Sequence, residues 1–315
     1  MKVNPQGLAV EPFLRISNAI RLQVDGGGLW PAKTTPFINQ RPASNLRCPC
    51  RIPVTGLQYA LFVCEIEGIL EVQVTVQVTV VVPTYNEQEN IEPLVTQLLA
   101  LPTAARVIVV DDNSPDGTGE IADRLATESD GRVGVIHRAG KLGLGTAYIA
   151  GFRQGLAEGA DLICTMDADF SHNPRYIPAM VDKIGQGYDL VIGSRYVRGG
   201  GSSGCTIDRK LLSWGANAFA RTMLGLRAHD TTAGFRCYRR EVLKGMDLDE
   251  IKASGYSFLI EMLYRVQRCG WQVGEVPIVF ENRRLGTSKI SRDEIIRALG
   301  TVLRLAWARL KGNQV

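Results

Sequence analysis

The chain has 315 residues, with 36 lysines and arginines against 32 aspartates and glutamates, and 45% of its residues are hydrophobic. This composition is typical of a globular protein and excludes a collagenous repeat, a charge-dominated disordered chain and a small disulfide-rich protein. The net charge of +4 comes without a basic stripe interleaved with aromatic residues, so we expect no nucleic acid partner, and no segment has the roughly 18 to 20 uninterrupted apolar residues of a transmembrane helix.

Residues 1–70 differ in composition from the rest of the chain. They contain Gly26-Gly27-Gly28, several prolines and no sustained hydrophobic period. We expect a poorly ordered N-terminal extension, which either has a role of its own or results from a wrongly assigned start. Cys48-Pro-Cys50 has no second cysteine pair or histidine at ligand spacing, so no zinc site is predicted there.

Strands and helices alternate from Val72 onward. Every second residue from Val72 to Val80 is valine, and Val81-Val82-Pro83 follows, which predicts a strand that is first half-buried and then fully buried. Further strands are expected at residues 106–110, 133–136, 162–166 and 190–192. Helices are expected at residues 89–101, 118–127, 145–158 and 174–184. This alternation predicts an α/β fold with a mostly parallel central sheet, helices on both faces, and ligands outside the carboxyl ends of the strands.

Polar side chains follow the first two expected strands. Pro83-Thr84-Tyr85-Asn86-Glu87 ends the first, and Val110-Asp111-Asp112 begins the loop after the second, which continues to Thr118. Acidic groups at adjacent strand ends are poor phosphate ligands but good acceptors for base N–H groups and ribose hydroxyls. Some of them also fit turn-forming roles. Together the two loops predict a nucleoside pocket.

The fourth expected strand ends in Asp167-Ala168-Asp169, with His172 close behind. Two carboxylates one residue apart can share Mg²⁺ or Mn²⁺ with a diphosphate, because such ions keep few protein ligands and fill the other positions with phosphate oxygens and water. For His172, help at the metal and a turn-stabilising role are both open.

Cations gather in the second half of the chain. Arg195 and Arg198 follow the strand at 190–192, and Arg209 and Lys210 open a helix with Ser213 one turn on. The remaining members of the set are Arg236, Arg283, Arg284 and Lys289. The loop from Arg283 to Lys289 contains a glycine and directly follows an expected strand, which suits closing over phosphates.

In order and spacing these motifs resemble the polyprenol (dolichol) phosphate mannosyltransferases of glycosyltransferase family 2. The residues that carry the resemblance are Pro83–Glu87, Val110–Asp112 with Ser114–Thr118, Asp167–Asp169, Gly193–Tyr196, Asp230–Arg236 and Arg283–Lys289. The resemblance covers about residues 78–291, and residues 1–70 have no counterpart in it. One departure is Thr232-Ala233, where the family usually reads Thr-Ser, so a role for position 233 is doubtful.

The resemblance implies a GT-A fold over residues 71–290 that transfers mannose from GDP-mannose to a polyprenyl (dolichyl) monophosphate with inversion, giving polyprenyl phosphate mannose and GDP. It implies that the guanosine is held by Pro83, Tyr85, Glu87, Val110 and Asp112. It places the diphosphate and a Mg²⁺ or Mn²⁺ ion at Asp167, Ala168 and Asp169, with Asp167 and Asp169 as the metal ligands.

The resemblance also assigns the cations. Contacts to the donor phosphates or the acceptor phosphate fall to Arg195, Arg283 and Lys289. Arg209 and Ser213 match positions near the acceptor phosphate. The residues expected to take part in catalysis are therefore Asp167, Asp169, Arg195, Arg283 and Lys289.

An acceptor phosphate is already anionic near neutral pH, so its attack on the anomeric carbon needs no strong base, and stabilising the departing diphosphate is the harder task. Asp230 stands roughly where relatives with hydroxyl acceptors have a catalytic base. Here we expect it to orient a cation, with base catalysis as the alternative.

Residues 291–315 are expected to form a C-terminal amphipathic helix, with leucines on one face, Trp307 at its flank and arginines on another face. Such a helix fits docking on a membrane surface, or packing on the domain or on a small membrane-anchoring subunit. Residues 209–227 form a second candidate for the membrane face. We therefore expect a cytoplasmic protein, peripheral on the cytoplasmic face of a membrane.

Two rival functions remain open at this point. One is an enzyme of the same fold that uses another nucleotide sugar, such as UDP-glucose, with a lipid phosphate acceptor. The other is a catalytically silent nucleotide-binding subunit, against which the presence of both the Asp167-Ala168-Asp169 motif and the Arg283–Lys289 loop argues.

Overall fold

The computed structural model describes residues 76–103, 105–251, 253, 255–282 and 292–311, except the side chains of residues 209 and 292–295. The N-terminal extension expected over residues 1–70, and the part of the first strand expected over residues 72–75, lie outside the described residues. The fold is that of the compact unit that begins at Gln77.

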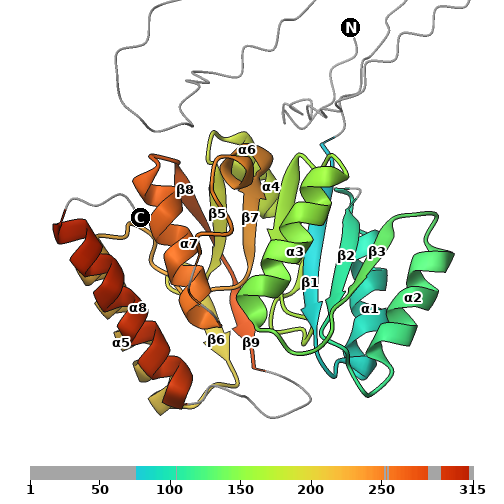
Figure 1. Cartoon of the computed structure of the whole chain (residues 1–315), viewed down its shortest axis with the longest axis horizontal. Coiled ribbons are helices and arrows are strands. Elements are labelled where there is room, and N and C mark those ends of the chain that lie inside the picture. Colours follow the sequence, from blue (N-terminus) through green and yellow to red (C-terminus); the bar gives the residue numbers. More distant parts are fainter. Residues whose placement is uncertain (1–75, 104, 252, 254, 283–291, 312–315) are drawn as a thin grey trace, which may run out of the picture. The chain divides into compact units, whose positions relative to one another are not determined.

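A central sheet of seven strands forms the middle layer (Figure 1), in the order β3-β2-β1-β4-β7-β5-β8. Its strands are β1 (Val78–Thr84), β2 (Arg106–Asp111), β3 (Val133–His137), β4 (Leu162–Thr165), β5 (Leu190–Ser194), β7 (Arg236–Arg239) and β8 (Val273–Pro277). Among these seven, β7 alone runs antiparallel to its neighbours β4 and β5. Two short strands, β6 (Gly201–Ser203) and β9 (Val279–Glu281), pair in a separate parallel ladder.

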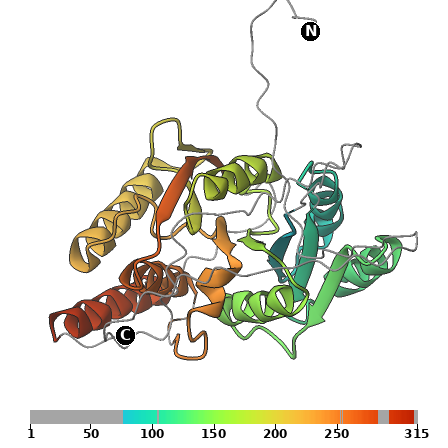
Figure 2. The same cartoon turned by 90° about the horizontal axis from the view of Figure 1, so that it is seen from above.

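Helices cover both faces of the sheet (Figure 2), as predicted, with α1 and α4 on one face and α3 and α7 on the other. The helices are α1 (Gln88–Leu99), α2 (Thr118–Glu128), α3 (Leu144–Ala157), α4 (Ile177–Gly185), α5 (Ile207–Leu224), α6 (Arg240–Lys244), α7 (Tyr256–Arg268) and α8 (Arg292–Leu310). The helix predicted from residue 174 begins with a 3-10 turn, η1 (Pro174–Tyr176), and continues as α4, because prolines lie at the start of both segments.

The strands are continuous apolar runs because both sheet faces are covered. Residues 80–82 and 107–110 are fully buried valines and isoleucine. On α3, Gly151 lets the helix approach β1 closely: a Cβ there would lie 2.2 Å from a methyl carbon of Val81. The close approach brings Tyr148 of α3 to the carboxyl end of β4, where its hydroxyl donates to Asp167 at 3.3 Å.

The chain runs from β1 outward to β2 and β3 and then crosses back to β4 on the other side of β1. This reversal of strand order, between β1 and β4, is a topological switch point. It separates the loops that follow these two strands and opens a crevice for ligands. The loops after β1 and β4 carry the first polar cluster and the Asp167-Ala168-Asp169 motif, respectively.

Helices α5 and α8 lie side by side at the β8 end of the sheet (Figures 1 and 2). One face of α8 is buried through Val302 and Leu305, and Arg304 forms an ion pair of 2.6 Å with the buried Glu261 of α7. Of the helices in the described part of the chain, none is both long and apolar enough to cross a membrane.

Candidate active site

Three strands of the sheet end in the same kind of backbone turn. Asn86, Asn113 and Phe170, which follow β1, β2 and β4, have φ angles of 60°, 57° and 59°. This left-handed region is unfavourable for side chains other than glycine, and such strain clusters at functional sites. The three turns redirect the chain where the predicted site residues lie. We call this edge of the sheet the carboxylate half of the site; it carries Tyr85, Asp111, Asp112, Asp167 and Asp169.

The ends of β1 and β2 are locked in register. Pro83 lies opposite Val110, and Thr84 lies opposite Asp111. Asp111 accepts hydrogen bonds from the hydroxyl of Thr84 at 3.0 Å and from the backbone N–H of Ser114 at 3.0 Å, so it holds the turn. The side chain of Val110 is buried in the core, and its backbone lies between β1 and β3, so its predicted contact with the guanosine stays a prediction. Of the two adjacent aspartates, Asp111 is thus engaged in the turn, and the predicted binding role of Asp112 stays open.

Asp112 forms an ion pair of 3.1 Å with Arg138, and both side chains are at most 10% exposed. Burial raises the pKa of the Asp112 carboxyl above its ordinary value, although Arg138 opposes the shift. Lys141 lies over the ring of Tyr85 at 4.6 Å from its centroid. Neither cation was predicted as a site residue; the signal that could have found Arg138 and Lys141 was their position directly after the third strand.

Asp167 and Asp169 lie in the turn after β4. Asp169 is 5% exposed and accepts from the backbone N–H of Ser171 at 3.0 Å, while Asp167 accepts from Tyr148. Among the described residues no group of three or more His, Cys, Asp or Glu side chains gathers into a metal site. The donor set fits a hard divalent ion that takes two carboxylate ligands and completes its shell with phosphate oxygens and water.

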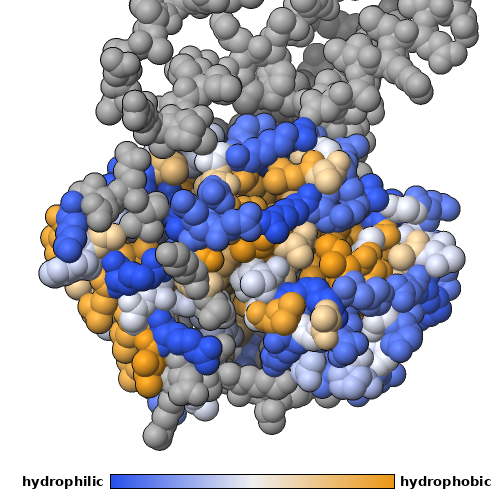
Figure 3. Space-filling view, viewed as in Figure 1, coloured by the Kyte–Doolittle hydropathy of each residue, from blue (hydrophilic) through white to orange (hydrophobic). Residues whose placement is uncertain are grey.

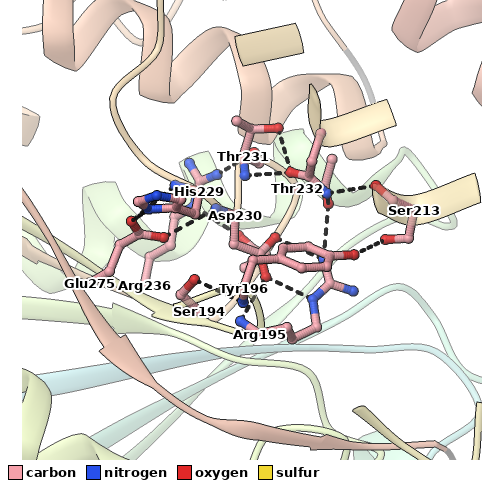
Figure 4. A network of polar contacts seen from close by, with 12 residues as sticks. Ser194, Arg195, Tyr196, Ser213, His229, Asp230, Thr231, Thr232, Arg236 and Glu275 are labelled. Carbon is pink, nitrogen blue, oxygen red and sulfur yellow. Dashed lines mark hydrogen bonds and ion pairs between the residues drawn. The ribbon is translucent and has the colours of Figure 1, made fainter. Parts of the chain in front are cut away.

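A second cluster, the arginine half, consists of Arg195, Asp230, Thr232 and the residues that hold them (Figure 4). Arg195 directly follows β5, and its Nε and Nη2 donate to the two carboxylate oxygens of Asp230 at 2.7 and 2.8 Å. Nη2 also donates to the hydroxyl of Thr232 at 3.0 Å, while Nη1 makes no hydrogen bond to any residue that the structure describes. One edge of the guanidinium is thus clamped and the other keeps donors for a ligand.

Burial disfavours the charged form of Arg195, but the hydrogen bonds and charge of Asp230 outweigh burial and raise the pKa of the guanidinium above its ordinary value. Asp230 itself is fully buried. This is the arrangement expected for an aspartate that orients a cation, and the part that Asp230 takes in the reaction stays a prediction.

The loop that carries Asp230 is anchored on several sides. Glu275 of β8 accepts from the backbone N–H of His229 at 2.9 Å and from that of Asp230 at 3.1 Å. Arg236 donates to the carbonyls of Thr231, Ala233 and Leu259 at 2.8 to 2.9 Å. Arg236, which the sequence places in the cationic set, is fully buried, so it holds this loop through its backbone carbonyls and is not exposed to a ligand.

The two halves meet around His172. The hydroxyl of Thr165, at the end of β4, donates to the carbonyl of Gly234 at 2.6 Å. His172 stacks on Phe235 at 5.2 Å, and its Nδ1 accepts from the backbone N–H of Asp167 at 3.1 Å. The structure therefore supports the turn-stabilising role for His172 and brings the aspartates of the carboxylate half next to the loop of the arginine half.

Two other predicted site residues have defined hydrogen-bond partners. Glu87 accepts from the side chain of Asn90 at 2.8 Å, and Ser213 of α5 accepts from the hydroxyl of Tyr196 at 2.8 Å. Arg209 lies in α5, but its side chain is outside the described part. Arg283 and Lys289 also lie outside the described residues, so their predicted contacts stay predictions.

Known proteins similar to this chain identify its family. Residues 79–246 match the family described as Glycosyl transferase family 2. The polyprenol monophosphomannose synthase of Mycolicibacterium smegmatis is 45% identical over 228 residues, which are 72% of this chain and 86% of the relative. The undecaprenyl-phosphate mannosyltransferase of Micrococcus luteus is 45% identical over 232 residues, which are 74% of this chain and 95% of the relative.

Among solved structures, glucosyl-3-phosphoglycerate synthase from Mycobacterium tuberculosis in complex with Mg²⁺ and UDP matches with a TM-score of 0.52. The match covers 73% of this chain and 79% of that one at 22% identity, so it concerns the fold. This fold is of the GT-A type, as predicted.

Proposed function

The chain is a member of glycosyltransferase family 2, and we propose that it transfers mannose from GDP-mannose to a polyprenyl monophosphate, releasing GDP. The single observation that carries this proposal is the meeting of a paired-aspartate turn with a clamped arginine at one edge of the sheet. The first suits a metal and a diphosphate, and the second suits an anionic acceptor. Two relatives that are 45% identical to this chain over 228 and 232 residues are named for mannose transfer to polyprenyl phosphates.

The carboxylate of Asp112 favours guanine as the base. The Watson–Crick edge of guanine offers adjacent N–H donors, and an ionised carboxylate accepts two hydrogen bonds side by side. Arg138, which forms the ion pair with Asp112, brings a donor toward the same place for a carbonyl oxygen of the base. Tyr85, with its ring under Lys141, adds a flat surface for stacking.

Asp167 and Asp169 are the residues that would hold a divalent metal in this protein. When bound there, Mg²⁺ or Mn²⁺ supplies Lewis-acid stabilisation of the diphosphate. The choice of these ions follows from the all-oxygen donor set, and a structural neighbour was crystallised with Mg²⁺ and UDP.

Arg195 and Asp230 have different roles in the proposed transfer of mannose. The acceptor phosphate oxygen attacks the anomeric carbon of mannose as the bond to GDP breaks, and the configuration at that carbon inverts. Arg195 neutralises phosphate charge through its Nη1 donors. Asp230 is engaged with Arg195 through both oxygens, so it keeps the guanidinium oriented and no side chain has to remove a proton from the anionic acceptor.

A lipid acceptor requires contact with a bilayer, and the outer faces of α5 and α8 form a candidate for it. This two-helix surface is defined by the exposed residues Ile207, Leu211, Leu212, Trp214, Met223, Ile296, Leu299, Leu303, Trp307 and Leu310. Figure 3 shows apolar side chains along α8 and α5.

Charge and aromatic content favour a bilayer as the occupant of the two-helix surface. The two helices contain seven arginines and lysines against three acidic residues, which suits anionic lipid headgroups. Trp214 and Trp307 are 62% and 63% exposed, and tryptophan favours the membrane interface. We propose a cytoplasmic protein that docks peripherally on the cytoplasmic face through this surface; a small membrane-anchoring subunit remains part of the proposal.

The proposal is tested by following label from radiolabelled GDP-mannose into a short polyprenyl phosphate in detergent, with Mg²⁺ or Mn²⁺. We expect metal-dependent transfer that Asp169→Ala abolishes. The exposed Asp249→Ala, which removes an aspartate that belongs to neither half of the site, serves as the control and should keep full activity. Inhibition by UDP and not by GDP would contradict a GDP-mannose donor and favour a uridine donor such as UDP-glucose. A folded protein that transfers no sugar at all would favour the catalytically silent subunit.

A further inference from the structure

Asn217 of α5 joins that helix to the loop of the arginine half. Its side chain is buried, at 3% exposed. Its Oδ1 accepts from the backbone N–H and the hydroxyl of Thr231 at 2.7 and 2.8 Å. Its Nδ2 donates to the carbonyl of Ser213 at 2.9 Å and to the hydroxyl oxygen of Thr232 at 3.3 Å. Every hydrogen-bonding atom of this amide is therefore used, with partners on both the helix and the loop.

The amide reaches Arg195 through one shared atom. The hydroxyl oxygen of Thr232 accepts from Nδ2 of Asn217 and also from Nη2 of Arg195. On the other side, Tyr196, the neighbour of Arg195, donates to the hydroxyl of Ser213 (Figure 4). Arg195 and Ser213 come from different elements, yet both are connected to the same buried amide.

We infer that Asn217 is a positioning residue, which holds Arg195 and Ser213 at a fixed separation and thereby builds the site of the acceptor phosphate. The inference rests on the proposed function, in which Arg195 contacts a phosphate, and on the prediction from the resemblance that Ser213 lies near the acceptor phosphate. Asparagine suits the position because it presents an acceptor and two donors at short reach, whereas aspartate lacks the donors and alanine lacks both. A hydrogen-bonded residue of this kind fixes the geometry of a site without contacting the substrate.

The same helix carries the two-helix surface on its outer face. Asn217 and Ser213 are four residues apart and share the inner face of α5, while Trp214 is exposed. Helix α5 therefore contributes to the proposed acceptor site through its inner face and to the proposed membrane contact through its outer face. We expect positioning by Asn217 to concern the acceptor, because the hydrogen bonds described for Asn217 go to α5 and to the loop of the arginine half.

The test compares Asn217→Ala and Thr232→Val with Thr232→Ser, which retains the shared hydroxyl. Thr222→Ala is the control on the same helix, because the hydroxyl of Thr222 donates within α5 to the carbonyl of Ala218 and is exposed. We expect Asn217→Ala and Thr232→Val to raise the KM for a short polyprenyl phosphate about tenfold or more, with the KM for GDP-mannose within about twofold of wild type. Thr222→Ala should match wild type, and Thr232→Ser should recover most of the acceptor affinity that Thr232→Val loses. The double variant Asn217→Ala/Thr232→Val should be less impaired than the product of the two single effects.

A merely structural residue would lower stability and affect both substrates alike. Equal rises in the two KM values, or wild-type kinetics in Asn217→Ala, overturn the inference. If Asn217→Ala does not fold, the Thr232→Val and Thr232→Ser pair decides by the same criterion. If the wild-type chain transfers no mannose, the proposed function fails by itself, and the inference is then judged by binding of the short polyprenyl phosphate without donor, which Asn217→Ala must weaken about tenfold.

Discussion

The carboxylate half of the site is placed by the ends of three parallel strands, whereas the arginine half is assembled from side chains on β5, α5, β8 and the loop before β7. In the first half, the register of β1 with β2 already sets Pro83 beside Val110. In the second half, hydrogen bonds between residues 14 to 46 positions apart do the positioning. One half of the site thus depends on backbone geometry, and the other depends on a network of side chains.

After the loss of transfer expected in Asp169→Ala, the next largest effect comes from breaking the arginine half at its centre. Asp230→Asn keeps the shape of the side chain but leaves the largely buried Arg195 without its counterion. We expect kcat/KM for the acceptor to fall about 10²- to 10³-fold, with weaker acceptor binding as a major part of the loss. Titration of acceptor binding measures the loss of affinity, and steady-state kinetics measure the total loss in kcat/KM. Full acceptor binding with abolished turnover would contradict the orienting role and favour base catalysis.

A smaller effect is expected in the carboxylate half. Asp112→Asn should weaken GDP binding about 10- to 100-fold, because an amide replaces one of the two acceptor oxygens with a donor. In wild type the raised pKa means that Asp112 takes up a proton at a higher pH than an ordinary aspartate. GDP affinity should therefore begin to fall, as pH is lowered, above the ordinary value of 3.8, and calorimetry should show no such fall in Asp112→Asn. An identical pH dependence in both proteins would exclude Asp112 from donor binding.

The third prediction concerns the two-helix surface and tests membrane binding independently of both halves of the site. Leu211→Glu combined with Trp307→Glu should reduce cosedimentation with anionic vesicles about tenfold, because charged groups replace apolar area that is buried in the interface. Leu142→Glu, at a leucine that is 63% exposed in the turn before α3, is the control for vesicle binding. Activity on a short acceptor in detergent should stay at the wild-type level in the double variant, and its loss would show that the surface also shapes the site.

The smallest effect concerns the backbone on which the carboxylate half is built. Asp116 accepts from the backbone N–H groups of Gln88 and Thr118, the first residues of α1 and α2, at 3.1 Å each. Burial raises the pKa of Asp116, but these hydrogen bonds, together with that from the Thr118 hydroxyl, outweigh burial and lower it. Asp116→Ala should cost about 1 to 2 kcal/mol of unfolding free energy at pH 7.

The sign of the pH effect depends on the lowered pKa. The stabilisation by Asp116 is present above its ordinary pKa of 3.8 and is lost as pH falls through the lower folded value. Denaturant titrations at pH 7 and at pH 3 should therefore show the gap between wild type and Asp116→Ala closing at the acidic end. A gap that stays constant would mean that Asp116 acts by shape and not by charge.

The contrast between the halves also explains what the sequence could predict. The strands and the positions of Asp112, Asp167 and Asp169 at strand ends follow from hydrophobic period and from the rule that ligands lie at carboxyl strand ends. Asn217 gave no such signal, because one asparagine in an amphipathic helix is as compatible with an exposed surface as with a buried network. The burial of Arg236 could not be predicted for the same reason: it depends on three carbonyls that only the folded chain brings together.

Glu275 has a consequence for the order in which the protein is made. It lies on β8, after the segment that matches the family, and it holds the loop of the arginine half by two backbone hydrogen bonds. Because a chain emerges from the ribosome with its N-terminal part first, β1, β2 and β4 can pair while β8 is still being synthesised. During biosynthesis the strand ends that carry the carboxylate half can therefore come together before the strand that completes the arginine half has been made.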